Sequence, residues 1–97
     1  MRWRPRRRLT RQRDTVDRAV DAYLAWRAEC RAVRNAYLTW TRGPAAAAAP
    51  AFDAYEAALE REEAAAHVYA ELMRRVGHLV ETGLARQLAL LSSTAGA

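Results

Sequence analysis

The sequence predicts an all-α fold in which two long antiparallel helices form a helical hairpin with a coiled-coil-like seam. Three observations support this. Apolar residues recur at alternating spacings of three and four along two long segments, a Gly-Pro pair separates the segments, and 23 of the 97 residues are alanine, the strongest helix former. A chain of 97 residues accommodates one domain at most.

Arginine content and helix-breaking residues divide the chain into five segments. These are a basic flexible arm (1–13), a helix (14–42), a loop (43–50), a second helix (51–82) and a short helical or disordered tail (83–97). Gly43 followed by Pro44 is a strong helix stop, and Pro50 suits the first turn of the next helix, where its missing N–H costs nothing. Gly83 is expected to end the second helix.

The apolar spacing predicts which residues of the two helices face each other. Folding the chain back at the loop forms layers whose residue numbers add to 92: Trp40/Phe52, Tyr37/Tyr55, Val33/Leu59, Cys30/Glu62, Trp26/Ala66, Tyr23/Tyr69, Ala19/Met73 and Val16/Val76. Each layer joins a heptad a position to a d position, as antiparallel helices require. The four tyrosines therefore read as core residues.

The two edges of the predicted seam differ in charge. On one edge Arg34 lies opposite Glu56 and Arg27 opposite Glu63, so cross-helix ion pairs are expected. The other edge, apart from Glu29, is uncharged and predicts an interface with a second copy, which would form a homodimeric four-helix bundle. Its interface residues are Ala22, Ala36, Ala58, Ala65, Leu72 and Leu79. The alternative is that alanine is abundant there only because it favours helix.

Charge is distributed unevenly along the chain. Residues 1–44 hold 12 arginines and 4 acidic residues, whereas residues 45–97 hold 4 arginines and 7 acidic residues. The arm contains no acidic residue, and its candidate nucleic-acid-binding residues are Arg2, Trp3, Arg4, Arg6, Arg7, Arg8, Arg11 and Arg13. Arginines can contact phosphates while Trp3 stacks on a base. An acidic protein partner, an anionic lipid surface, or no independent function of the arm are the alternatives.

Several functional classes are disfavoured by what the sequence holds. Cys30 is the single cysteine, so neither an intrachain disulfide nor a cysteine zinc site is expected. No catalytic motif, cofactor or metal site is predicted, and no apolar run approaches the length of a membrane span. We therefore expect a cytoplasmic protein. Arginine in place of every lysine, with abundant alanine, is typical of a GC-rich bacterial genome.

Two known families resemble this chain in architecture. Glu63 and His67 lie on one helical face, and short two-helix members of the ferritin-like class bind two irons through Glu-x-x-His; here Ala66 stands three residues after Glu63. The WXG-type secreted helical hairpins are similar in length and shape and carry Trp-x-Gly in the turn; here Trp40 precedes Gly43 by three residues. These resemblances imply metal binding or secretion as remote alternatives.

The sequence thus predicts a small non-enzymatic interaction or scaffold protein that self-associates. The main alternative is a nucleic-acid-associated protein that dimerises through the hairpin and binds through residues 1–13.

Overall fold

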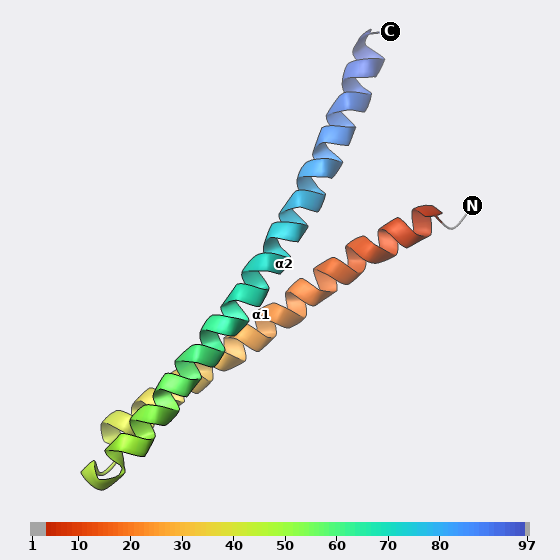
Figure 1. The fold of residues 1–97 in the computed structure, drawn as a ribbon. Coiled ribbons are helices and arrows are strands. Elements are labelled where there is room, and N and C mark those ends of the chain that lie inside the picture. The colour runs from red at the N-terminus through yellow and green to blue at the C-terminus, as the bar shows by residue number, and fades with distance from the viewer. Residues whose placement is uncertain (1–3, 97) are drawn as a thin grey trace.

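The chain folds into two long α-helices joined by a short turn (Figure 1). The computed structural model describes the backbone of residues 4–96 and the side chains of residues 10–93. Helix α1 spans Arg4–Arg42 and helix α2 spans Ala48–Gly96, with a single 3-10 turn, η1 (Ala45–Ala47), between them. No strand occurs among residues 4–96, so the predicted all-α class is confirmed.

Helix α1 begins at Arg4, ten residues before the expected start at Asp14. Residues 4–13 are therefore helical where a flexible arm was expected. The physical reason is that no helix breaker lies between Arg4 and Asp14 except Pro5, which stands in the first turn, where proline is tolerated. Arginine is itself a good helix former.

The turn follows Gly43 and Pro44, as the sequence predicts. The amide of Gly43 donates to the carbonyl of Thr39 at 3.0 Å, which closes the last turn of α1. Pro44 is extended, with φ of −68° and ψ of 150°, and its carbonyl accepts from Ala47 at 3.0 Å. No glycine in the described chain has a positive φ, so Gly43 does not use the left-handed conformation expected of a helix cap.

Helix α2 runs through Gly83 to Gly96, so the expected helix end at Gly83 is wrong. A glycine inside a helix costs only about 1 kcal/mol relative to alanine. The residues that follow Gly83 are mostly leucine, alanine, arginine and glutamine, which favour helix, and none is proline. The expected tail is therefore a continuation of α2.

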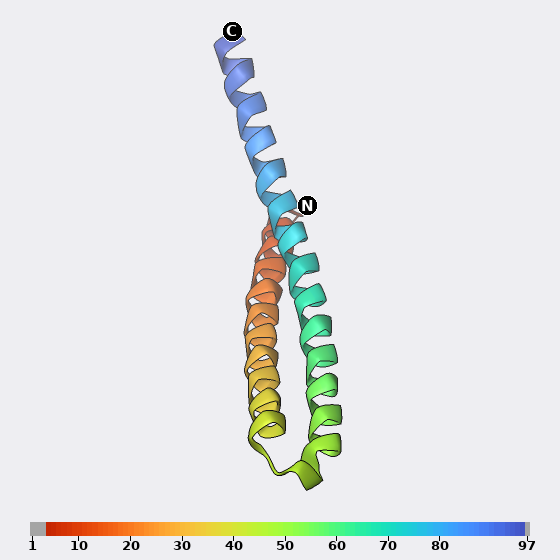
Figure 2. The same ribbon diagram turned by 90° about the vertical axis from the view of Figure 1, so that its left-hand side faces the viewer.

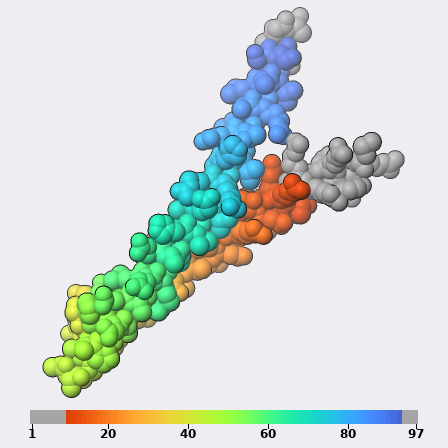
Figure 3. All heavy atoms as spheres, viewed as in Figure 1, coloured from red at the N-terminus to blue at the C-terminus, as the bar shows by residue number. Residues whose placement is uncertain are grey.

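The two helices run in opposite directions, lie side by side from the turn onward, and diverge toward the two termini (Figures 1 and 2). The molecule is accordingly long and thin, with principal extents of 78 × 29 × 13 Å. The space-filling view shows the same separation at the open end (Figure 3). A layer of two helices has two broad faces, and its narrowest dimension is close to one helix diameter.

The core of this layer is very small. Among the residues with described side chains, only Ala19, Ala22 and Ala58 are buried, and no large side chain is fully buried. Ala58 is 1% exposed and marks the closest packing of the two helices. Because alanine removes little surface from water, this contact alone provides little hydrophobic stabilisation.

Aromatic rings line one side of the helix contact near the predicted register. Tyr23 contacts Tyr69 with ring centroids 5.5 Å apart, and Tyr37 contacts Tyr55 at 5.7 Å. Trp40 contacts Phe52 at 4.9 Å. All three are pairs whose residue numbers add to 92. The register inferred from spacing therefore describes these contacts correctly.

Candidate functional site

An exposed apolar surface on one broad face of the helix pair is the main candidate site. Its centre is an open groove of about 400 Å³ between the helices. We call this surface the apolar face and define its groove by Val16, Ala19, Val20, Tyr23, Tyr69, Met73 and Val76. Val20 is 52% exposed and Tyr23 is 42% exposed. Exposed apolar side chains gathered in one groove are typical of interaction surfaces, so this groove is a candidate for one.

The apolar face extends beyond its groove in both directions along the helices. Tyr37 lies two heptads after Tyr23, Leu59 two heptads before Met73 and Val80 one heptad after Met73, so they continue the rows of the groove, and all three are exposed. Beyond Val80, α2 exposes Leu84, Leu88, Leu90 and Leu91. Sequence reasoning assigned these leucines no role because Gly83 was expected to end the helix.

The position of the contact between the helices explains why residues of the predicted layers remain exposed. Val16, Tyr23 and Met73 belong to the predicted layers, yet each is more than 40% exposed. The helices approach each other through alanines, with Ala58 at the closest point, so the larger seam residues lie to one side of the contact. One helix partner therefore covers only part of the seam.

Glu62 is the acidic residue within the seam, and its carboxylate is held by the other helix. Its Oε1 atom accepts a hydrogen bond from the indole N–H of Trp26 at 2.9 Å and lies 4.0 Å from the Cys30 sulfur. The Trp26 ring also stacks on Tyr69, with centroids 5.7 Å apart. The carboxylate of Glu62 is therefore held within the seam by a hydrogen bond from a neutral donor.

The opposite broad face carries charge around its groove. This groove is lined by Ala22, Ala25, Val68 and Leu72 together with Arg18, Asp21, Glu71 and Arg75. Glu71 forms ion pairs with Arg74 and Arg75 on the same helix. The hydrogen bond from Arg74 is the main cause that lowers the pKa of the Glu71 carboxyl below its ordinary value. Because charged side chains line this groove, the opposite broad face is less apolar than the apolar face.

The uncharged edge predicted as a dimer interface borders the contact between α1 and α2. Ala22 and Ala58 are buried, and Ala36, Ala65, Leu72 and Leu79 are half-buried within the single chain. Ala22 and Leu72 also line the open groove of the opposite broad face, so an interface with a second copy along this edge stays a prediction. The smallest side chains allow the closest helix approach, so the helices rotate toward the alanines.

The predicted cross-helix ion pairs are absent from the part of the chain whose side chains are described. No ion pair joins Arg27 to Glu63 or Arg34 to Glu56; Glu63 instead lies 3.8 Å from His67 on its own helix. The cross-helix ion pair that does form is between Arg61 and Glu29, at 3.4 Å, on the opposite edge. The rotation that buries the alanines separates the first two pairs.

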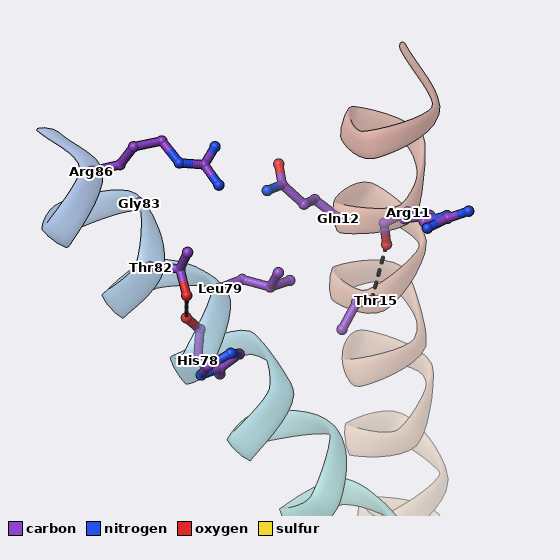
Figure 4. Close-up of a pocket in the computed structure, with 8 residues that line it drawn as sticks. All are labelled: Arg11, Gln12, Thr15, His78, Leu79, Thr82, Gly83 and Arg86. Carbon is purple, nitrogen blue, oxygen red and sulfur yellow. Dashed lines mark hydrogen bonds between the residues drawn. The ribbon is translucent and has the colours of Figure 1, made fainter. Parts of the chain in front are cut away.

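A cleft of about 340 Å³ lies where the helices diverge. In the close-up, Arg86 of α2 and Gln12 of α1 point toward one another, whereas Arg11 points away (Figure 4). The hydroxyls of Thr15 and Thr82 donate to carbonyls of their own helices, at 3.0 and 2.8 Å. The two arginines therefore do not converge on one point, and the cleft is not an evident anion site.

The arginine-rich segment is described only in part. Arg2 and Trp3 lie outside the described residues, and for Arg4, Arg6, Arg7 and Arg8 the helical backbone alone is described. Arg11 and Arg13 are exposed on α1. Helix α1 thus exposes at least Arg11 and Arg13 to solvent, at the end of the molecule where the two helices diverge.

Two other properties of the described residues bear on function. No group of three or more His, Cys, Asp or Glu side chains lies close enough to hold a metal ion. Neither helix contains a stretch both long and apolar enough to cross a bilayer.

These features define an all-α protein of two helices with an exposed apolar face. Comparisons with models of protein families, with curated proteins and with solved structures gave no match. The functional interpretation therefore depends on the geometry of the chain itself.

Proposed function

We propose that this chain is a non-enzymatic helical-hairpin interaction module that completes its hydrophobic core by self-association. The main support for the proposal is that the solvent-exposed surface area of the chain is large for its mass. The chain exposes 8004 Å², whereas a compact monomer of 10.9 kDa is expected to expose about 5,600 Å². The excess of roughly 2,400 Å² per chain is large enough for an obligate interface.

The composition of the core supports the same proposal. A stable domain packs two layers of secondary structure around large apolar side chains. Here the buried residues with described side chains are Ala19, Ala22 and Ala58, while valines, tyrosines and leucines remain exposed. A second copy that covers these side chains would supply the missing layer and give a four-helix bundle.

The test is the oligomeric state and its link to folding. Sedimentation equilibrium from about 1 to 100 µM is expected to give twice the monomer mass of 10.9 kDa, and the melting temperature is expected to rise with concentration. A monomer that unfolds cooperatively, at a temperature independent of concentration, would refute the proposal.

A second candidate function is nucleic-acid binding through the N-terminal part of α1. The observation that favours it is a continuous helix that carries arginines from Arg4 to Arg13 with no acidic residue in that range. Arg11 and Arg13 are exposed, and neither is ion-paired to a residue whose side chain the structure describes. The experiment is fluorescence anisotropy on duplex and single-stranded oligonucleotides. A log–log salt slope of up to about −6 is expected if all seven arginines of residues 1–13 displace counterions. Unchanged affinity after removal of residues 1–13 would exclude this candidate.

A further inference from the structure

Two rows of residues, one on each helix, border the apolar face. The arginines of one row form no ion pair with the glutamates of the other row within the chain. Together the two rows indicate how a second copy would dock. On α1, Val20, Arg27 and Arg34 follow one another at intervals of seven, so they lie on one side of the helix. Val20 lines the groove of the apolar face, and the two arginines continue the row toward the turn. All three side chains are exposed.

Helix α2 carries the complementary row on the same face. Glu56, Glu63, Ala70 and Gly77 also follow at intervals of seven. Gly77 lies four residues after Met73, which lines the groove, so this row borders the same groove. Around Gly77 there is open space within 4 Å of the position that a Cβ atom would occupy.

The two rows match in height along the molecule. Contacts such as Tyr23 with Tyr69 show that residues whose numbers add to about 92 lie opposite each other. Arg27 is therefore level with Glu63, and Arg34 with Glu56, within about one half-turn of helix. Neither pair forms an ion pair within the chain.

We propose that a second copy of this chain docks on the apolar face around a twofold axis parallel to the long axis of the molecule. This inference rests on the proposed self-association and adds its geometry. Such an axis lays α1 of one copy on α2 of the other, antiparallel and at the heights found within one chain. Arg27 then faces Glu63 of the partner subunit, and Arg34 faces Glu56 of the partner subunit.

Steric complementarity supports the same arrangement. The α1 row places the bulky Val20 level with the small Ala70 of the α2 row. In the proposed dimer, Val20 packs on Ala70 of the partner subunit, and the open space at Gly77 lets the helices approach closely. Small residues facing large ones fill an interface without voids.

The other twofold arrangement is disfavoured by charge. An axis perpendicular to the long axis would lay α1 on α1, so the row that contains Arg27 and Arg34 would face itself. The row that contains Glu56 and Glu63 would face itself as well. Like charges placed opposite each other across an interface oppose association and select against that orientation.

The opposite broad face is a less suitable docking surface. Its groove has Arg18, Asp21, Glu71 and Arg75 on the rim, and Glu71 already pairs with its neighbours on α2. Docking there would require desolvation of charges that have partners within the chain, which is costly. The groove of the apolar face has no charged side chain in its lining.

Reversing the charges of one row at a time tests this docking geometry. One variant carries Arg27→Glu and Arg34→Glu, and the other carries Glu56→Arg and Glu63→Arg. Each variant alone places like charges opposite each other in the dimer and is expected to raise the dimer Kd by about 30-fold or more, because four charge pairs become repulsive. An equimolar mixture restores opposite charges at every pair, so it is expected to form a heterodimer with a Kd within about threefold of the parent.

The matched control changes two arginines with the same spacing elsewhere on α1. Arg11 and Arg18 are also seven residues apart, and Arg18 lines the groove of the opposite face. Arg11→Glu with Arg18→Glu changes the net charge by the same amount and is expected to leave the dimer Kd within about threefold of the parent. Circular dichroism of each sample measures helicity, and a variant that is unfolded alone but helical in the mixture supports the proposal equally.

Three outcomes separate the inference from the proposed function. A parent chain that stays monomeric overturns both. A dimeric parent whose charge variants bind as tightly as it does overturns the docking geometry and leaves self-association standing. Variants that are weakened but not rescued by mixing would show that the charges act within one chain, which also overturns the geometry.

A distance measurement provides an independent check of the axis. In a Cys30→Ser background, a spin label at Ala46→Cys marks the turn of each copy. The proposed axis places both turns at one end of the dimer, so a short distance between labels is expected. A distance comparable with the 78 Å length of the molecule would mean that the copies lie head to tail and would overturn the proposal.

Discussion

Trp26 of α1 donates its indole N–H to the carboxylate of Glu62 on α2, at 2.9 Å, and stacks on Tyr69 of the same helix. This contact joins the helices at a layer where an acidic residue interrupts the apolar pattern. Both side chains are half-buried. A polar contact of this kind fixes the register of the two helices because any other alignment would leave Glu62 without the indole donor.

The first prediction concerns this hydrogen bond. Trp26→Phe keeps an aromatic ring but removes the N–H, and it is expected to lower the free energy of unfolding by about 1–2 kcal/mol. Trp26→Ala also removes the stacked ring and is expected to cost about 3–5 kcal/mol, nearer the lower value because Trp26 is half-buried. Chemical denaturation at fixed protein concentration measures both. Trp40→Phe is the control, since Trp40 contacts rings but forms no hydrogen bond through its indole. Equal effects of the two Trp→Phe changes would contradict the assignment.

Ala58 provides a test of the close helix approach. Because its side chain is 1% exposed, Ala58→Leu has no space and should force the helices apart, at a cost of about 1–3 kcal/mol in unfolding free energy. Ala64→Leu, at an exposed position of the same helix, is expected to change stability by less than about 0.5 kcal/mol. Thermal melts followed by circular dichroism compare them. A stabilised Ala58→Leu variant would mean that the helices do not pack through this alanine.

Two glycines should respond to alanine in opposite directions. At Gly83 the space for a Cβ atom is open, so Gly83→Ala should stabilise α2 by about 0.5–1 kcal/mol. At Gly43 the added Cβ atom would lie 2.6 Å from the Thr39 carbonyl oxygen, so Gly43→Ala should destabilise the turn. Unfolding free energies of the two variants test this. A helix that ends at Gly83 in solution would show no gain from the first change.

The Glu71 carboxyl should titrate below its ordinary pKa of 4.5, because Arg74 donates a hydrogen bond to it and Arg75 adds a favourable charge. Carbon-detected NMR titration measures this pKa directly. Because the folded-state pKa is lowered, the stabilisation by this ion pair is present above about pH 4.5 and is lost as pH falls through the folded-state pKa. Arg74→Gln should return the pKa toward 4.5. A value unchanged by that substitution would contradict the stated cause.

Much of the fold is determined by local sequence properties. Alanine and arginine favour helix, Pro44 stops it, and the alternating spacing aligns Tyr23 with Tyr69 and Tyr37 with Tyr55. These are properties of single helices and of a repeating pattern, so they can be derived without coordinates. Helix ends were harder to predict. Gly83 is a weak breaker whose effect depends on its neighbours, and α2 continues through it.

The rotation of each helix about its own axis was decided only by the tertiary structure. Spacing indicates an apolar stripe, but it does not indicate which part of that stripe the partner helix covers. Close packing favours contact through the smallest residues, so Ala22 and Ala58 became buried while Tyr23 and Val20 remained exposed. The same rotation leaves the apolar face exposed, and Arg27 and Glu63 form no ion pair with each other. The sequence therefore determined two antiparallel stripes, and packing determined which half of each stripe stays exposed.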